Sequence, residues 1–277
     1  MRKMGRSLSL LLQYIGMIVV VIIFMAPLYW TAITSFKSSW EVIKRPPSFI
    51  PERFLIENYV AILSNPEFVK NLVNSVIACS GSLALALVTG LPAAYVLSRF
   101  KFKGSRSLYY TYITFRMLPP FVFLIPLFVI YRVTGLYDTW LGLILAYSVI
   151  TIPITVWMMV GFYDSLPREL EEAALVDGCS RARAFLHVVL PLSAPGIAST
   201  AMLNVIFTWN DFVFALVLTS YKAATVPIAL LGFIGYTEVK WHLLAAATII
   251  ASLPLLAIAF FVQKYLIRGL TFGAIKG

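Results

Sequence analysis

Charged residues are scarce in this sequence, and their scarcity excludes an ordinary soluble globular protein. Only 12% of the 277 residues are Asp, Glu, Lys or Arg, whereas soluble domains carry about a quarter. Hydrophobic residues make up 60% of the chain. They form apolar runs of roughly 20 residues or more, which are typical of membrane-crossing helices and lack the alternation of barrel strands. The composition predicts an all-α membrane protein.

Cysteine and histidine are also rare, which leaves no support for a disulfide framework or a metal centre. Cys79 falls within a predicted span and Cys179 within a loop, so the two thiols lie at different levels. His187 and His242 stand alone, without the closely spaced ligands of a metal site. We therefore expect no metal ligand and no catalytic residue in this chain.

A phosphate-binding loop is missing as well. Such a loop needs Gly-x4-Gly-Lys followed by Ser or Thr, so that backbone N–H groups surround the phosphates. Residues 269–276 contain glycines and a lysine, but the spacing is wrong and no hydroxyl residue follows. We expect that the chain is not an enzyme and that any ATP is hydrolysed by a partner.

The apolar runs predict six spans. They cover residues 11–35, 71–98, 108–131, 139–163, 195–220 and 243–266. The first run is too long for a cleaved signal peptide and is expected to be a retained span. With the N-terminus inside, 13 Lys and Arg lie on the inner side and 8 on the outer side, which favours cytoplasmic N- and C-termini. The net charge of +10 then reflects topology, and we expect no nucleic-acid partner.

Prolines interrupt several predicted spans. Single prolines are common in membrane helices, but the pair Pro119-Pro120, close to Arg116, predicts a bend in the third span. Residues 223–236 form an apolar segment that is too short to cross a membrane. We expect this segment to lie at the outer surface or to re-enter the membrane against protein.

A polar, Ala-rich segment between the fourth and fifth spans, residues 166–178, predicts a short surface helix. Pro167 suits a first turn, three glutamates follow where the helix dipole favours anions, and Gly178 suits the left-handed residue that ends a helix. One face is apolar and small, and consists of Leu166, Leu170, Ala173 and Ala174. A second helix is predicted over residues 180–189, stopped by Leu190-Pro191. Helix physics alone fits a surface linker and a docking helix equally well.

The same residues resemble the signature loop of bacterial ATP-binding-cassette importer permeases. The matching positions are Glu172-Ala173-Ala174, Asp177-Gly178, Phe185, Leu190-Pro191 and Pro195. The tail from Gln263 to Gly277 and the run Trp209-Asn210-Asp211-Phe212 are similar to the carbohydrate-importing branch, specifically its six-span maltose-type permease subunit. The resemblance runs from the first span to the last residue, with Cys179 where a small Ala is usual and Asp211 where Glu is common.

The resemblance implies a single transmembrane permease domain, residues 1–277, in a bacterial cytoplasmic (inner) membrane. The helix at residues 166–178 would dock on an ATPase subunit and couple ATP closure to movement of the spans. The implied coupling residues are Glu171, Glu172, Ala173, Ala174, Asp177, Gly178 and Phe185. The implied partners are two ATPase subunits that bind ATP and Mg, a second homologous permease in a heterodimer, an extracytoplasmic solute-binding protein and membrane lipid. This chain itself would bind no cofactor.

Polar residues inside the spans are the candidates for a solute path, because burying them is unfavourable unless they are partnered or face water. These candidates are Arg116, Asn204, Thr208, Trp209, Asn210 and Asp211. Bonding between helices explains the face from Asn204 to Asp211 equally well. For Asn74, Ser75 and Ser80 we expect such bonding.

Three other functions are weighed against a sugar permease. A permease for a polyol or a glycerol-phosphate-type solute would share the loop and the spans. An ion-coupled secondary transporter could use Asp211 and the broken helices, but the inner loop does not suit that class. A membrane-embedded enzyme lacks paired catalytic groups.

Overall fold

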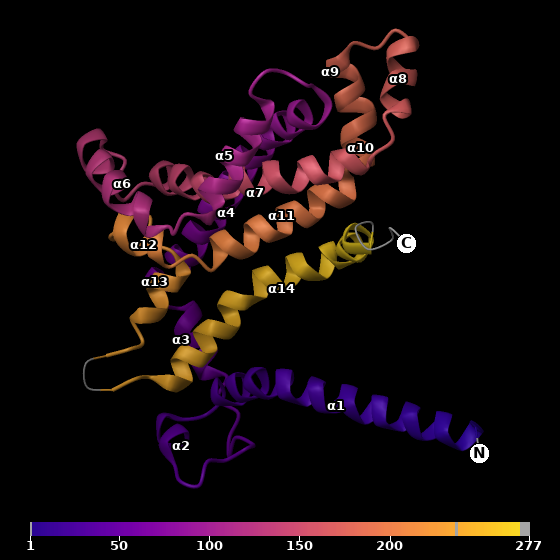
Figure 1. The fold of residues 1–277 in the computed structure, drawn as a ribbon. Helices are drawn as coiled ribbons and strands as arrows, with labels where there is room; N and C mark the ends of the chain where they lie inside the picture. Colours follow the sequence, from indigo (N-terminus) through magenta and orange to yellow (C-terminus); the bar gives the residue numbers. More distant parts are fainter. Residues whose placement is uncertain (1, 236–237, 272–277) are drawn as a thin grey trace. The chain divides into compact units, whose positions relative to one another are not determined.

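The computed structural model describes residues 2–235 and 238–271, with the side chains of residues 2–9, 11, 116 and 264–271 outside that description. The described chain is helical, apart from a single antiparallel bridge between Ile234 and Val239. It divides into two compact units, and Figure 1 labels the helices of both. Unit 1 comprises residues 1–69 and 230–252, and unit 2 comprises residues 70–229 and 253–277.

Unit 1 begins with a long apolar helix. Its helices are α1 (Arg2–Thr34), α2 (Ser39–Ile43), α3 (Glu57–Leu63) and the first part of α14 (Trp241–Thr271). The loop after α1 is held by buried polar groups. Asn58 Nδ2 donates to the carbonyls of Ser35 and Lys37, both at 2.9 Å, and Glu41 Oε1 accepts the N–H of Glu52 at 2.9 Å.

Unit 2 is built around two buried helices. Its helices are α4 (Pro66–Arg99, which starts in unit 1), α5 (Ser105–Met117), α6 (Phe121–Thr134), α7 (Trp140–Ser165), α8 (Glu169–Val176), α9 (Arg181–Ala184), the π-helix η1 (Phe185–Val189), α10 (Leu190–Leu192), α11 (Ala194–Trp209), α12 (Val213–Leu218) and α13 (Val226–Leu231, which ends in unit 1). α7 packs along α11, and Tyr147 and Tyr163 of α7 are fully buried. α8 and α9 lie side by side at one end of the unit, far from α6 and α12 (Figure 1).

Four described helices are long and apolar enough to cross a membrane. They cover Leu12–Thr34, Pro66–Arg99, Trp140–Ser165 and Trp241–Gln263. A fifth candidate is the pair Arg181–Leu192 and Ala194–Trp209, which is bent by 74°. The prediction of an all-α membrane protein is confirmed, with four or five candidate spans among the described residues.

The predicted third span, residues 108–131, is broken and not continuous. α5 ends at Met117 and α6 starts at Phe121. Leu118, the residue before the proline pair, is extended at φ −69° and ψ 134°, as expected because a following proline ring disfavours the helical conformation. The bend predicted from Pro119-Pro120 is therefore confirmed, and it separates two helices.

Two further predicted boundaries need correction. The fifth span was expected over residues 195–220, but α11 ends at Trp209 and α12 starts at Val213. The cause is Asp211, whose Oδ1 accepts the N–H of Phe214 at 3.1 Å and so caps the first turn of α12. The helix after Ser180 does not stop at Leu190-Pro191. It continues to Leu192 through the π-helix η1, whose wider turns accommodate a residue without an N–H.

Candidate functional site

α8 is a short surface helix whose end is fixed by backbone geometry. After Val176 the chain turns at Gly178, which has φ +85°. The N–H of Gly178 bonds to the carbonyl of Leu175 at 3.1 Å, and the N–H of Cys179 bonds to the carbonyl of Ala174 at 3.0 Å. This pair of bonds is the Schellman motif, which favours glycine at the left-handed position. The predicted helix and its stop at Gly178 are therefore present, but the helix begins at Glu169 and not at residue 166, because Leu166 is extended at φ −80° and ψ 135°.

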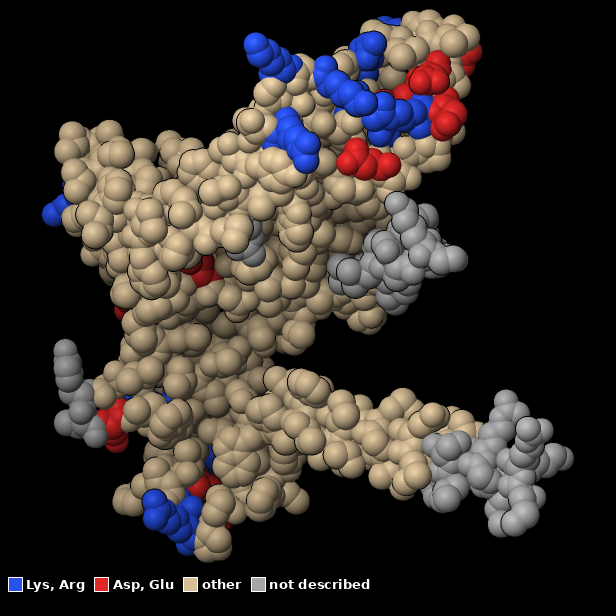
Figure 2. Space-filling model, viewed as in Figure 1, with Lys and Arg blue, Asp and Glu red and all other residues tan. Residues whose placement is uncertain are grey.

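The outer face of α8 combines exposed apolar residues with carboxylates. Val176 is 87% exposed and Leu170 45% exposed, and Glu172 and Ala173 lie open between them. Charged side chains gather around α8 and α9, while most of the visible surface of unit 2 is uncharged (Figure 2). Exposed apolar groups within a charged rim are typical of a surface that binds another protein.

Glu171 points the other way and fastens α8 to α4. Its Oε1 lies 2.5 Å from Arg99 Nε, and its Oε2 accepts the hydroxyl of Tyr95 at 2.9 Å. The side chains of Arg99 and Glu171 are only 6% and 12% exposed. A second cross-link runs from Arg99 Nη2 to the carbonyl of Leu166 at 3.2 Å. α8 is thus attached firmly to the end of α4.

Phe185 is an anchor of the same kind. Its ring lies 4.7 Å from the ring of Tyr95 and 6.4 Å from that of Tyr163, measured between centroids. These rings belong to an apolar cluster that also contains Met159 and Val189. The residues assigned to coupling therefore separate into two groups. Glu171 and Phe185 face inward, whereas Glu172, Ala173, Asp177 and Gly178 are exposed and Ala174 is half-buried.

A cavity of about 530 Å³ in unit 2 is lined by two of the residues predicted for the solute path. Asn210 and Asp211 line it together with aromatic rings. These rings belong to Phe115, Phe123, Phe207, Phe212 and Phe214. A carboxylate and an amide beside apolar rings can bind a hydroxylated solute, since the polar groups bond hydroxyls and the rings cover apolar faces.

The other predicted path residues do not line this cavity. Asn204 is fully buried, and its Nδ2 donates to the hydroxyl of Thr155 in α7 at 2.8 Å. The hydroxyl of Thr208 lies 3.1 Å from Cys79 Sγ in α4, and Trp209, 7% exposed, packs in the same cluster. These three residues bond and pack helices together. The side chain of Arg116 lies outside the described residues.

Sequence reasoning missed Asp138, which organises the end of unit 2 opposite α8. Its carboxylate accepts the N–H groups of the four consecutive residues 220–223, at 3.0 to 3.2 Å. Asp138 itself has φ 56°, a conformation that Asp tolerates better than most residues. Burial acts to raise the pKa of this carboxyl, but the four backbone N–H groups outweigh burial and hold the pKa below its ordinary value. The sequence gives no sign of this interaction, because Asp138 and the loop that it binds are far apart along the chain and share no motif.

Polar residues of α4 form hydrogen bonds with the same loop and with Val226 just after it. Asn74 Nδ2 donates to the carbonyls of Lys222 and Ala224 at 2.9 and 2.8 Å, and its Oδ1 accepts Trp140 Nε1 at 2.8 Å. Ser75 Oγ accepts the N–H of Val226 at 2.9 Å. Asn74 and Ser75 thus bond other elements as predicted. Ser80 was expected to bond another helix, but among the described residues its hydroxyl bonds only carbonyls of its own helix, so that prediction is wrong.

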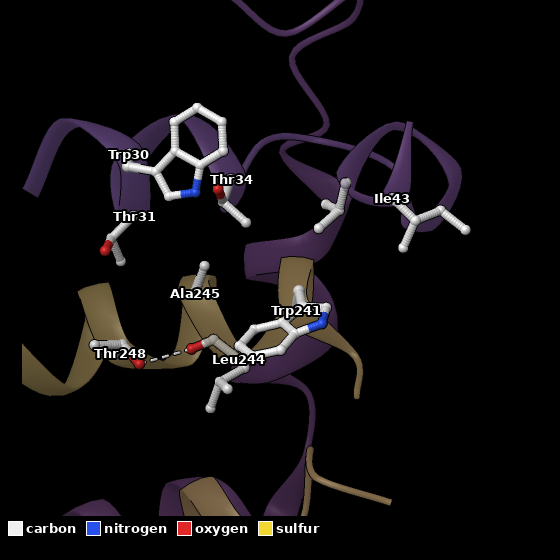
Figure 3. Close-up of a pocket in the computed structure, with 9 residues that line it drawn as sticks. Trp30, Thr31, Thr34, Ile43, Trp241, Leu244, Ala245 and Thr248 are labelled. Carbon is white, nitrogen blue, oxygen red and sulfur yellow. Dashed lines mark hydrogen bonds between the residues drawn. The ribbon is translucent and has the colours of Figure 1, made fainter. Parts of the chain in front are cut away.

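Unit 1 contains a separate cavity of about 470 Å³ between α1, α2 and α14 (Figure 3). The rings of Trp30 and Trp241 border it, together with the threonines Thr31, Thr34 and Thr248. The hydroxyls of Thr31 and Thr248 donate to carbonyls of their own helices, at 2.9 and 2.8 Å.

Within the described residues, no group of three or more His, Cys, Asp or Glu could hold a metal ion in this or any other place.

Comparison with known proteins assigns the chain to a family. The model of the binding-protein-dependent transport system inner membrane component matches residues 86–272. The trehalose/maltose transport system permease protein MalG of Thermococcus litoralis is 35% identical over 274 residues, covering 98% of each chain. The trehalose transport system permease protein SugB of Mycobacterium tuberculosis is 35% identical, covering 91% of this chain and 92% of that protein.

The fold agrees with this assignment. A bacterial ATP-binding-cassette transporter involved in import of the acidic polysaccharide alginate superposes with a TM-score of 0.79, at 20% identity, covering 95% of this chain and 98% of the other. Such a permease is a multi-pass inner membrane protein that binds no cofactor and is not an enzyme. ATP is hydrolysed by a partner ATPase, and the transport system depends on a binding protein. This chain belongs to the binding-protein-dependent transport system inner membrane components, the permease subunits of ATP-binding-cassette importers.

Proposed function

We propose that this permease imports a sugar and receives its driving force through the exposed face of α8. The observation that carries the proposal is the division of α8 into two faces. Glu171 is bound to Arg99 and Tyr95, so the helix is rigidly attached to α4. Val176, at 87% exposure, lies on a face that no described residue covers. A rigidly mounted helix with a free apolar face can transmit a push from a partner.

The partner at this face is an ATPase subunit, and two of them with ATP and Mg serve the heterodimer of this chain with a second permease. The exposed residues Glu172, Ala173, Asp177 and Gly178 form the contact with the ATPase, with Ala174 at its edge. Glu171 and Phe185 hold the helix in place beneath it. ATP-driven closure of the ATPases then moves α8 and the spans attached to it.

We further propose a single permease domain over residues 1–277 with six crossings and both termini in the cytoplasm. The broken pair α5 and α6 is the sixth crossing, because its two helices contain 13 and 14 residues and together reach the length of a span. The Lys and Arg distribution supports the orientation. In this orientation α8 faces the cytoplasm, where ATP is present, and the loops beside Asp138 face outward to the solute-binding protein.

The solute is a sugar that passes the cavity lined by Asn210 and Asp211. The carboxylate and amide suit hydroxyl groups, and the phenylalanine rings suit the apolar faces of a pyranose. The names of the relatives point the same way: two are trehalose or trehalose/maltose permeases, and one from Streptomyces coelicolor is a diacetylchitobiose permease. A carboxylate at the cavity favours a neutral sugar over a glycerol phosphate, because like charges repel. Arg116 stays a candidate for the path.

The test is uptake by proteoliposomes that contain this chain, its sister permease, the ATPase and the binding protein. Labelled trehalose, maltose and diacetylchitobiose serve as probes. We expect uptake of at least one probe that requires internal ATP and persists when the proton gradient is collapsed. Uptake that continues without the ATPase, or that stops on loss of the gradient while ATP is constant, would favour a secondary transporter and contradict the proposal.

A further inference from the structure

Helix α4 is fixed at both of its ends to other elements of unit 2. At one end, Tyr95 and Arg99 bind Glu171 of α8, at 2.9 and 2.5 Å. At the other end, Asn74 and Ser75 bind the loop that follows α12. Asn74 and Arg99 are 25 residues apart on an unbroken helix, which corresponds to about 37 Å at 1.5 Å per residue. The helix thus joins two distant points of the unit.

The loop at the far end, residues 219–225, is held unusually tightly, and we name it the clamp loop. Its N–H groups at 220–223 all point to the Asp138 carboxylate. Its carbonyls at Lys222 and Ala224 accept from Asn74, and the N–H of Val226 just after it bonds to Ser75. The loop therefore uses N–H groups to bond Asp138, next to the start of α7, and carbonyl groups to bond Asn74 of α4. These bonds fix the loop to both helices.

α4 also fits closely against α7 between its ends. A Cβ atom added at Gly81 would lie 2.5 Å from Ile144 Cδ1, and one added at Gly90 would lie 2.7 Å from Thr155 Cγ2. The glycines thus let α4 approach α7 closely at two points, where sliding of one helix past the other would displace side chains. This close fit favours joint movement of α4 and α7.

We propose that α4 is a strut that carries the displacement of α8 to the clamp loop, with Asn74, Ser75 and Asp138 as positioning residues. The clamp loop directly follows α12, whose first turn is capped by Asp211 at the cavity. A push on α8 is thus delivered to the element that borders the solute path. This inference rests on the proposed function, because it needs a partner that moves α8.

The experiment measures ATP-dependent movement of the clamp loop without using any solute. Both native cysteines are replaced by alanine, and Tyr221→Cys, at a side chain that is 63% exposed, is labelled with a membrane-impermeant maleimide in the complete complex in proteoliposomes. Labelling is compared without nucleotide and with ATP plus vanadate. We expect a labelling rate that differs at least threefold between the two states.

The decisive variant is Asn74→Asp, which keeps the acceptor for Trp140 but removes both donors to the clamp loop. This variant should reduce the ATP-dependent difference in labelling rate to less than 1.5-fold, while its rate of ATP hydrolysis stays within twofold of the parent's. Asn65→Asp is the matched control, because Asn65 uses only its acceptor oxygen, toward the N–H groups of Glu67 and Phe68, and the difference should persist. Ser75→Ala, a milder change, replaces Asn74→Asp if that variant does not assemble. The ATP-dependent difference in labelling rate of Asp138→Asn should lie between that of the parent and that of Asp138→Ala.

Three results would overturn the strut. The first is ATP hydrolysis by the parent with no change in labelling. The second is the full ATP-dependent difference in labelling rate in the Asn74 and Ser75 variants. The third is a joint loss of hydrolysis and labelling, which indicates misfolding. Failure of the proposed function is distinguishable, since it shows in the parent complex as uptake without the ATPase.

Discussion

Glu171 and Glu172 are neighbours in the sequence but lie in different environments. Glu171 is bound in a nearly buried pair with Arg99, whereas Glu172 is exposed. Removing one partner of a buried pair leaves an uncompensated charge, which is destabilising by about 3 kcal/mol or more. We expect Glu171→Ala to lower the free energy of unfolding by about that amount in detergent, while Glu172→Ala changes it by less than about 0.5 kcal/mol.

A charge reversal at the exposed Glu172 should affect function without affecting folding. Glu172→Arg is expected to disturb contact with the ATPase and to reduce uptake more than tenfold with the permease still folded. Equal loss of stability in Glu171→Ala and Glu172→Ala would contradict the assignment of the two faces of α8.

Asp211 has two tasks, which a pair of substitutions can separate. Its Oδ1 caps α12, and the residue lines the cavity. Asn retains an acceptor oxygen, so Asp211→Asn should leave stability within about 0.5 kcal/mol, whereas Asp211→Ala loses the cap and about 1 kcal/mol. Both should raise the KM for uptake several-fold, measured with the best labelled probe. An unchanged KM in both variants would remove Asp211 from the solute path.

At the scale of the element, α8 depends on its final turn. Gly178 and Gly104 both have positive φ, +85° and +93°, and a Cβ at either would meet nothing within 4 Å. Alanine at each should therefore cost about 1–2 kcal/mol of backbone strain. We expect Gly178→Ala to lower uptake per ATP hydrolysed, because the turn orients the face of α8 that we propose docks on the ATPase. Gly104→Ala is the matched control and should change stability alone. A similar loss of uptake per ATP in Gly178→Ala and Gly104→Ala would show that backbone strain alone causes the defect, whatever the position of the glycine in the fold.

The clamp loop should respond to acid through Asp138. The pKa of this carboxyl is held below its ordinary value by backbone N–H groups. A depressed pKa means that the stabilisation is complete above the unfolded-state pKa of about 3.9 and is lost as pH falls through the folded-state value. We expect full stability near pH 7 and a decline below about pH 4 that is smaller in Asp138→Asn. Thermal unfolding between pH 3 and pH 7 measures this decline. An identical decline in the parent and in Asp138→Asn would show that Asp138 does not cause the loss of stability in acid.

Elements governed by local chemistry were predictable from the sequence. The apolar runs located α4, α7 and α14, Pro119-Pro120 located the break between α5 and α6, and Gly178 located the end of α8. The inward turn of Glu171 was not predictable, because three nearby glutamates fit the same helix start and only the position of Arg99 distinguishes them. Asp138 was missed for the same reason: its partners lie more than 80 residues away.

At the scale of the whole molecule, the two ends of unit 2 differ in character. One end carries the charged surface around α8, and the other carries the clamp loop and the cavity with Asp211. The proposed mechanism needs three parts: a surface where the ATPase acts, a rigid connection, and a border of the solute path that can move. In this proposal, the bonds at both ends of α4 supply the connection.

The most direct measurement is site-specific cross-linking from α8 in the assembled, ATP-hydrolysing complex. In a chain whose native cysteines are replaced by alanine, a photoactivatable maleimide is attached at Val176→Cys or at Val133→Cys, two sites that are 87% and 83% exposed. We predict that the ATPase subunit is captured from position 176 and not from position 133, with a yield that changes on adding ATP. A complex that imports sugar while position 176 captures no ATPase would contradict the account.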